Sequence, residues 1–365
     1  MTYAWFFGGA GWNQDAQFDL TRALVERRTL HVDGYAVNTE DVSPGRHGHT
    51  YINKPPGVSM LAAIPYTLIL AAEKLMHLPI DDLARANAWM VTAAACGACG
   101  ALIGATLFVY GRKIGASPAA ALTVALSIVF GTIVFEYSTM LFAHVPSAPF
   151  MLLALVWLRD CPLLAGLAVG AATACFYVCA LAAGVLMIVA GRRALHLIRD
   201  PPGHLSHTLL RLAMDHVSRS QPAIHAQGSF SRGPARSDAR RFVGSALLAL
   251  SRSLYTSPVL LFAFVGMIVM IRRRKMIAEL IAIAAIAIVF IVVISGFNGW
   301  NGGWAFGPRY LLPIIPLLGV PMMFAAGAAH RLWILVAALS VAINFVATAV
   351  GPMPPDTLKD PMRQW

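Results

Sequence analysis

The chain has 365 residues, of which 58% are hydrophobic and 12% are charged, and its mean hydropathy is +0.67. This composition is typical of a polytopic membrane protein and excludes a water-soluble enzyme. The net charge of +11 does not indicate nucleic-acid binding, because Lys and Arg cluster between apolar runs, as in RRRK at 272–275. Clusters of that kind are expected on the cytoplasmic side of a membrane.

The first apolar stretch, MTYAWFFGGAGW, is shorter than the roughly 20 residues that a helix needs to cross a bilayer. We interpret it as the exit end of a membrane helix whose upstream part precedes Met1. The polar segment 13–54 follows, in which DLTRALVERRTL has helical periodicity and GYAVNTEDVSPGRHGHTY is rich in turn residues. A loop of this length is long enough to be functional. We therefore expect residues 1–56 to form a functional loop at one face of the membrane, and the family resemblance given below implies that it is a catalytic loop on the outer face.

The rest of the chain alternates between apolar runs and short polar connections. Membrane helices are expected over 57–191 and 256–350, separated by a polar loop at 192–255 and followed by a tail at 351–365. The individual apolar runs lie at 57–76, 86–110, 118–136, 140–158, 163–190, 256–271, 277–295, 310–327 and 331–350. The fold class is thus an all-α polytopic membrane protein with about 8–10 transmembrane helices.

A parity argument identifies one run that does not simply cross the membrane. Seven runs separate the first polar loop from the loop before residue 310, whereas two loops on one face need an even number of crossings. Placing the basic connections in the cytoplasm puts 192–255 outside and makes 57–76 interfacial, re-entrant or strongly broken. This run opens with two prolines and contains Pro65. The alternative place for the break is the long run 163–190.

Two carboxylates in the first loop, Asp15 and Asp19, are one helical turn apart. One interpretation is a solvated helix start, capped by Asp15 or Asn13. The other is that one carboxylate is a general base, which removes a proton from an acceptor hydroxyl at the membrane surface. Spacing alone favours the first interpretation.

Two cations flank the membrane in segments rich in Pro, Gly and aromatic residues. Lys54, in HTYINKPPG, precedes two prolines and is therefore held on a stiff backbone. Arg309 and Tyr310, in GWNGGWAFGPRY, lie at the start of an apolar helix. Both cations could bind a phosphate, and both could equally be interfacial side chains that extend to the headgroups.

Ionisable residues inside apolar runs are costly and are candidates for function. Glu136 and His144 flank the sequence YSTMLFA near segment ends, and His144 is the stronger candidate. Asn298 and Asn301 are expected to line one cavity together with these residues. The five cysteines all lie in or beside apolar runs, which indicates buried thiols rather than disulfides or a metal site. We name no metal ligand.

Three blocks of the sequence together resemble a known family. NQDAQFDLTRALVERRTLHVDGY, YINKPPGVSMLAAIPY and GWNGGWAFGPRYLLPIIPLL are similar to segments of the bacterial C-type membrane glycosyltransferases, which are related to protein O-mannosyltransferases and to the lipid A aminoarabinose transferase. The resemblance covers the first 65 residues and about 296–320 well, and elsewhere it is mainly the alternation of apolar runs. It implies the C-type glycosyltransferase fold, with juxtamembrane helices in the first outer loop.

The resemblance also implies roles for individual residues. The catalytic carboxylate is Asp15, with Asp19 as the alternative, because the family often has two adjacent acids where this chain has Gln14 and Asp15. The residues expected to bind the donor phosphate are Lys54, Tyr51, Arg309 and Tyr310. The residues expected to line the cavity are Asn53, His144, Trp300, Asn301 and Trp304.

The chain departs from the family in two further ways. Asn53 replaces the acid that usually precedes the lysine, which argues against a metal at that position, although a divalent cation stays an open alternative. The first membrane helix of the family is missing before the polar loop, so a late annotated start, a fragment or a decayed copy are all compatible with the sequence.

The activity implied is transfer of a sugar, with inversion, from a polyprenyl-phosphate donor to a lipid, glycan or protein acceptor at the outer face of a bacterial inner membrane. The expected partners are membrane lipid, the polyprenyl-phosphate sugar and an acceptor, with no nucleic acid. No nucleotide-binding fingerprint is present in the sequence. Two alternatives remain open: a non-catalytic binder or transporter of lipid-linked sugars, and an inactive truncated paralogue.

Overall fold

The structure is a computed structural model, and it describes residues 2–9, 11–45, 48–79, 82–190, 239–296, 306–326 and 330–351. The first polar loop is compact and ordered. It begins with the 3₁₀ helix η1 (Thr2–Trp5) and continues with α1 (Trp12–Arg22), which passes directly into the π-helix η2 (Ala23–Arg27). An antiparallel hairpin of β1 (Val42–Pro44) and β2 (Thr50–Ile52) follows, with Val42 opposite Ile52.

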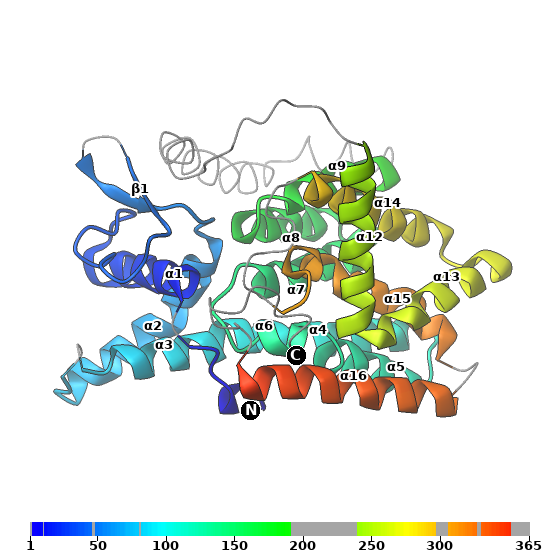
Figure 1. The fold of residues 1–365 in the computed structure, drawn as a ribbon, viewed down its shortest axis with the longest axis horizontal. Helices are drawn as coiled ribbons and strands as arrows, with labels where there is room; N and C mark the ends of the chain where they lie inside the picture. Colours follow the sequence, from blue (N-terminus) through cyan, green and yellow to red (C-terminus); the bar gives the residue numbers. More distant parts are fainter. Residues whose placement is uncertain are drawn as a thin grey trace.

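The rest of the described chain is helical. The elements in order are α2 (Gly57–Leu75), α3 (Ala84–Thr92), the π-helix η4 (Ala93–Gly97), α4 (Ala98–Lys113), α5 (Pro118–Phe130), α6 (Val134–Tyr137), α7 (His144–Trp157), α8 (Pro162–Cys175), α9 (Cys179–Ala190), α12 (Ala239–Thr256), η6 (Pro258–Leu260), α13 (Leu261–Arg273), α14 (Ile277–Ser295), η7 (Arg309–Ile314), α15 (Ile315–Ala325) and α16 (His330–Val350). In Figure 1, α1 and the hairpin lie together at one end of the molecule, above α2 and beside the helix bundle.

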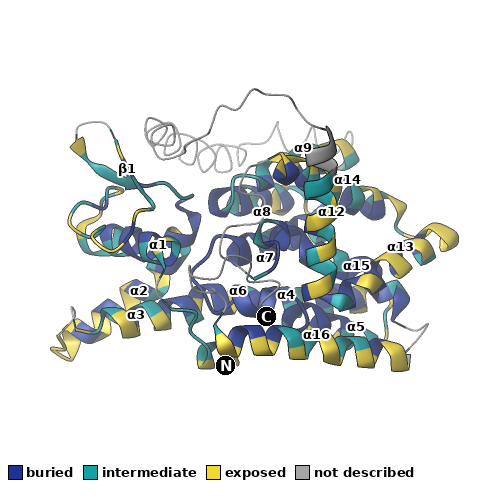
Figure 2. Ribbon diagram, in the orientation of Figure 1, coloured by how far each residue is buried: buried dark blue, intermediate teal, exposed yellow. Residues whose placement is uncertain are grey.

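Four described helices are long and apolar enough to cross a membrane, namely Gly57–Leu75, Ala84–Lys113, Ile277–Ser295 and Arg331–Val350. A fifth span is reached if α12 and α13, which meet at 110°, count as one broken span. Residues along the outward faces of these helices are exposed, as the yellow segments of Figure 2 show. The exposed apolar side chains include Leu68 on α2, Ile288 on α14 and Leu335 on α16. A surface of this kind suits lipid rather than water. The all-α polytopic architecture predicted from the sequence is confirmed.

Run 57–76 is neither broken nor turned back on itself, so those two alternatives were wrong, whereas an interfacial placement of this run stays a prediction. α2 is one continuous helix that includes Pro65, which membrane helices tolerate because neighbouring groups satisfy the freed backbone carbonyl. The alternative location is where the chain breaks: run 163–190 forms α8 and α9, with a non-helical connection at 176–178.

The end of the predicted polar loop also differs from expectation. Residues 239–255 belong to helix α12, whose sequence FVGSALLALSRSLY repeats apolar residues at helical spacing. The preceding part of that loop, 191–238, lies outside the described residues.

The contact between α2 and α8 fixes where the first loop joins the bundle. A Cβ built on Gly57 would lie 2.5 Å from the backbone carbonyl of Ala174, so only glycine allows the two helices to approach this closely. The loop itself is tied to α2 through Glu26, which accepts hydrogen bonds from Tyr66 (2.6 Å), Tyr35 (2.9 Å) and Arg22 (2.9 Å). The hydrogen bond between Tyr66 and Glu26 therefore ties the polar loop to α2.

Candidate active site

The two carboxylates of α1 differ in their exposure. Asp15 lies in the first turn of the helix and is partly buried, whereas Asp19, one turn later, is only 3% exposed. Within the described part of the chain, the Oδ2 atom of Asp19 is buried and has no hydrogen-bond partner. Such orphaned polar atoms are rare in folded proteins and usually have a functional explanation.

Burial shifts the protonation of both acids. Desolvation raises the pKa of Asp19 to about 7, the charge of Asp15 adds to the rise, and the charge of Arg22 opposes it. Desolvation also raises the pKa of Asp15. A carboxylate that is less acidic than usual is a stronger base, so this pair is suited to accept a proton near neutral pH.

Helix α1 is held beside the start of α2 by Gln17, which lies between the two acids in sequence. Its Nε2 donates a hydrogen bond to the carbonyl oxygen of Pro55 (3.3 Å). In return, the Ser59 hydroxyl donates to the Gln17 side-chain oxygen (2.6 Å) and to its backbone carbonyl (2.8 Å). Since Pro55 directly follows Lys54, these bonds place the acid-bearing helix next to the lysine segment.

Lys54 is paired with an acid that the sequence analysis did not single out. Its Nζ lies 2.9 Å from Oδ1 of Asp41, and the backbone N–H of Asn53 donates to the Asp41 carbonyl (3.0 Å). The signal for this partner is the hairpin register: Val42 lies opposite Ile52, so Asp41 is brought across from Asn53. Asn53 has a buried Oδ1 with no partner among the described groups, and the ring of Tyr51 covers Gly45.

His144, at the start of α7, is the centre of an aromatic cluster. Its ring centroid lies 4.8 Å from that of Phe176 and 5.4 Å from that of Tyr310, and the Phe176 and Tyr310 rings stack at 6.1 Å. Phe142 and Tyr137 close the cluster at 6.1 and 6.4 Å. Phe176 occupies the connection between α8 and α9, so the break in that run places an aromatic ring against His144.

A cation from a distant part of the sequence reaches this cluster. The Arg309 guanidinium carbon lies 5.0 Å from the ring centroid of Phe142 and 5.4 Å from that of Tyr310. Across the described residues, both ring nitrogens of His144 and the Nε of Arg309 are buried without a hydrogen-bond partner. The cluster thus presents unsatisfied nitrogens and positive charge in one place.

Other predicted residues are not joined to this cluster. In the described part of the chain, neither Asp15 nor Asp19 forms an ion pair or a hydrogen bond with Lys54 or Arg309. Glu136 is fully buried, and neither of its carboxylate oxygens has a partner among the described groups. Four predicted cavity residues lie outside the described residues: Asn298, Trp300, Asn301 and Trp304.

Sequence reasoning also missed Gln17, Phe142 and Phe176. No local signal marks them, because their contacts are made with residues of other segments: Gln17 with Pro55, Phe142 with Arg309, and Phe176 with Tyr310. Single aromatic residues inside apolar runs cannot be told from ordinary core residues by spacing.

Comparison with known proteins gives a structural match and no sequence match. No protein-family model matches the chain, and no curated protein matches it by sequence. The structure is similar to the crystal structure of ArnT from Cupriavidus metallidurans bound to undecaprenyl phosphate, with a TM-score of 0.60 and 13% sequence identity. The match covers 96% of this chain and 63% of the ArnT chain, so this chain spans less than two thirds of the length of that protein. The chain therefore has the C-type membrane glycosyltransferase fold that the sequence predicted.

Proposed function

We propose that the protein transfers a sugar from a polyprenyl-phosphate donor to a lipid, glycan or protein acceptor at the outer face of a bacterial inner membrane. The observation that carries this proposal is the buried, unpartnered Nε of Arg309 in the aromatic cluster that also contains the unpartnered ring nitrogens of His144. A phosphate would accept a charge-assisted hydrogen bond from the Arg309 Nε–H and a hydrogen bond from the N–H nitrogen of His144. We assign Lys54 to the same phosphate.

The neighbouring surfaces support a lipid-linked donor. The cluster lies where α7 and η7 begin, within a bundle whose outer faces are apolar. A polyprenyl chain could lie along such a surface while its phosphate meets the cations. The fold adds to this argument, because the ArnT structure that it resembles was obtained with undecaprenyl phosphate bound.

The chemical step we propose is a single displacement. The acceptor hydroxyl oxygen attacks the anomeric carbon while its proton passes to the carboxylate of Asp15. The bond between the anomeric carbon and the phosphate oxygen breaks, and the electron pair leaves with the polyprenyl phosphate. Lys54 and Arg309 stabilise the growing negative charge on that oxygen. Attack from the opposite side inverts the anomeric centre.

Asp15 is favoured as the base because its side chain is more accessible than that of Asp19. Asp19 remains the alternative, since its pKa of about 7 suits proton transfer at neutral pH. Tyr51 and Tyr310 complete the donor site in this proposal, and Asn53, Trp300, Asn301 and Trp304 complete the cavity.

The test is sugar transfer from a polyprenyl-phosphate sugar in membrane vesicles that contain the full-length protein. Asp15→Asn should keep the fold and slow transfer about 10²- to 10⁴-fold, as expected for loss of a general base. Lys54→Ala should weaken donor binding and slow the chemical step together. Normal transfer by Asp15→Asn, with loss of transfer in Asp19→Asn, would identify Asp19, one helical turn later, as the general base. Normal transfer by both variants would refute the carboxylate mechanism, and donor binding without turnover by the wild type would favour a non-catalytic binder.

A further inference from the structure

The first loop contains a second cluster of chemically active side chains, away from the proposed transfer site. His31 and Asp33 follow the end of η2, and His49 precedes β2. Their potential ligand atoms all lie within 4.8 Å of one another, and in the described chain they are the only group of three or more His, Cys, Asp or Glu residues that do so. The proposed transfer mechanism uses none of the three.

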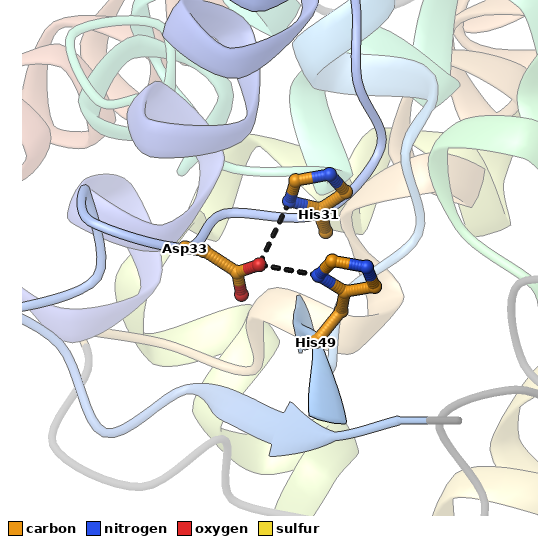
Figure 3. A group of neighbouring side chains, drawn as sticks. All are labelled: His31, Asp33 and His49. Atoms are coloured by element: carbon orange, nitrogen blue, oxygen red, sulfur yellow. Dashed lines mark hydrogen bonds and ion pairs between the residues drawn. The ribbon is translucent and has the colours of Figure 1, made fainter. Parts of the chain in front are cut away.

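Both imidazoles direct the same atom toward one carboxylate oxygen (Figure 3). Nδ1 of His49 lies 2.6 Å and Nδ1 of His31 lies 3.0 Å from Oδ2 of Asp33. The two rings are stacked, with centroids 4.2 Å apart and planes inclined by 16°. Two nitrogens and one oxygen therefore converge on a single point from two segments of the chain.

Hydrogen bonding accounts for only part of this arrangement. His49 and Asp33 share a hydrogen bond through Nδ1 and Oδ2, but Nδ1 of His31 is buried and has no hydrogen-bond partner in the described chain, despite its short distance to Asp33. Ligands at about 2.0–2.1 Å from a tetrahedral ion are about 3.3 Å apart. The two nitrogen–oxygen separations, 2.6 and 3.0 Å, are shorter than this value, and the two rings are stacked. An ion would therefore need the Asp33 oxygen to move outward and one imidazole to rotate out of the stack, so that both ring nitrogens point at it.

The backbone around the cluster is already fixed. The Thr50 amide donates to Oδ1 of Asp33 (2.6 Å), and the Val32 amide donates to the Thr50 carbonyl (2.8 Å). Arg27 donates to the Asp33 carbonyl (2.8 Å). A backbone hydrogen bond to one carboxylate oxygen, with the other oxygen facing the two imidazoles, is the outer-shell arrangement expected around a metal-binding carboxylate.

The cluster is open to solvent. The side chains of His31, Asp33 and His49 are 27%, 36% and 44% exposed, so an ion and a completing water molecule can reach the cluster from solvent.

We propose that His31, Asp33 and His49 form a binding site for a divalent transition-metal ion, with Zn²⁺ as the best match. Two imidazole nitrogens and one carboxylate oxygen suit zinc, with water in the fourth position. Mg²⁺ and Ca²⁺ match poorly, since they prefer octahedral or larger sets of oxygen ligands. The ion would join the segment after α1 to the strand that leads to Lys54. The site stands whether or not the protein transfers sugars.

Zinc binding to the full-length protein, purified in detergent without a histidine tag and stripped with a chelator, tests this site directly. Competition with a chromophoric zinc indicator should give one tight site per chain. His31→Gln, His49→Gln and Asp33→Asn should each weaken binding at least tenfold. Asp33→Asn keeps an oxygen for the Thr50 amide, so it separates the metal role from the hydrogen bond. His77→Gln is the matched control, because His77 is exposed and outside the cluster, and it should bind zinc as the wild type does.

X-ray absorption of the zinc-loaded wild type provides a second measurement that depends on no variant. The expected spectrum shows two imidazoles and oxygen ligands in the first shell. Equal zinc affinity in His31→Gln and the wild type, or a first shell without two imidazoles, would overturn the proposal. Absence of a tight site in the wild type would do the same, and would leave the cluster as a pair of histidines that share a carboxylate through protons alone.

Discussion

Replacing Asp19 by asparagine tests whether this carboxylate is buried in the way the structure describes. The folded protein raises its pKa from the ordinary value of 3.8 to about 7, chiefly by desolvation. Asparagine has nearly the same shape and no charge. The substitution should therefore remove a stability penalty that the wild type carries only at pH values at which Asp19 is ionised in the unfolded chain.

The size and sign of the effect follow from proton linkage. Below pH 4, Asp19 is protonated in the folded and unfolded states, and it carries no charge penalty. Between about pH 4 and pH 7 the unfolded state is ionised while the folded state keeps its proton, so the stability of the wild type falls as pH rises through about 7. A difference of about 3 pH units at ~1.4 kcal/mol per unit amounts to about 4 kcal/mol. The 3% exposure of Asp19 means that solvent screens little of this penalty.

The assay is reversible unfolding in mixed micelles with sodium dodecyl sulfate, followed by tryptophan fluorescence between pH 4 and pH 8. The free energy of unfolding of Asp19→Asn, relative to wild type, should increase by about 4 kcal/mol across this range, because the variant loses the penalty. Asp15→Asn is the matched control: it is more exposed, so its own effect should be smaller. A difference between Asp19→Asn and wild type that does not change with pH would refute the reasoning.

Two further substitutions test the neighbourhood of Lys54. Gly57→Ala should destabilise the protein by about 1–3 kcal/mol and weaken polyprenyl-phosphate binding, because the new Cβ would meet the Ala174 carbonyl at 2.5 Å and push the start of α2 away from α8. Thermal unfolding and lipid binding check this prediction. Gly184→Ala is the control, since nothing lies within 4 Å of a Cβ at that position. A Gly57→Ala variant with wild-type stability and lipid binding would contradict the close approach of the two helices. Asp41→Asn should free Lys54 from its ion pair and tighten undecaprenyl phosphate binding roughly fivefold, equivalent to about 1 kcal/mol. Asp160→Asn is the control: it removes the exposed partner of Lys113, beyond the other end of α7, and should leave the affinity for undecaprenyl phosphate unchanged. An unchanged affinity in Asp41→Asn would show that the Lys54–Asp41 ion pair does not compete with the ligand.

The apolar runs made the membrane architecture predictable, because their length and lack of charge leave few alternatives. The position of the helix break was not predictable. Pro65 suggested a break in α2, yet the break occurs at 176–178, where the sequence FYV contains neither proline nor glycine. There Phe176 stacks on Tyr310 and packs at a tilt against His144. Such contacts join distant segments and leave no local pattern.

The residues of the candidate site were likewise predictable only in part. Lys54 and Arg309 stood out in the sequence because each is a cation at a membrane boundary, and in the structure Arg309 contacts the aromatic cluster around His144. Asp41 and the histidine cluster did not stand out. They are brought into place by backbone pairing, of Val42 with Ile52 and of Val32 with Thr50, which composition and spacing do not specify.

The central claim is that the Lys54, His144 and Arg309 cluster binds the phosphate of a polyprenyl lipid. It is tested most directly by comparing the binding of undecaprenyl phosphate and undecaprenol, which lacks the phosphate, to the purified full-length protein. The account predicts that the wild type prefers the phosphate form by at least tenfold, and that Lys54→Ala combined with Arg309→Ala removes the preference while undecaprenol binding is unchanged. Equal affinity of the wild type for the two lipids, or a preference that survives in the double variant, would contradict it.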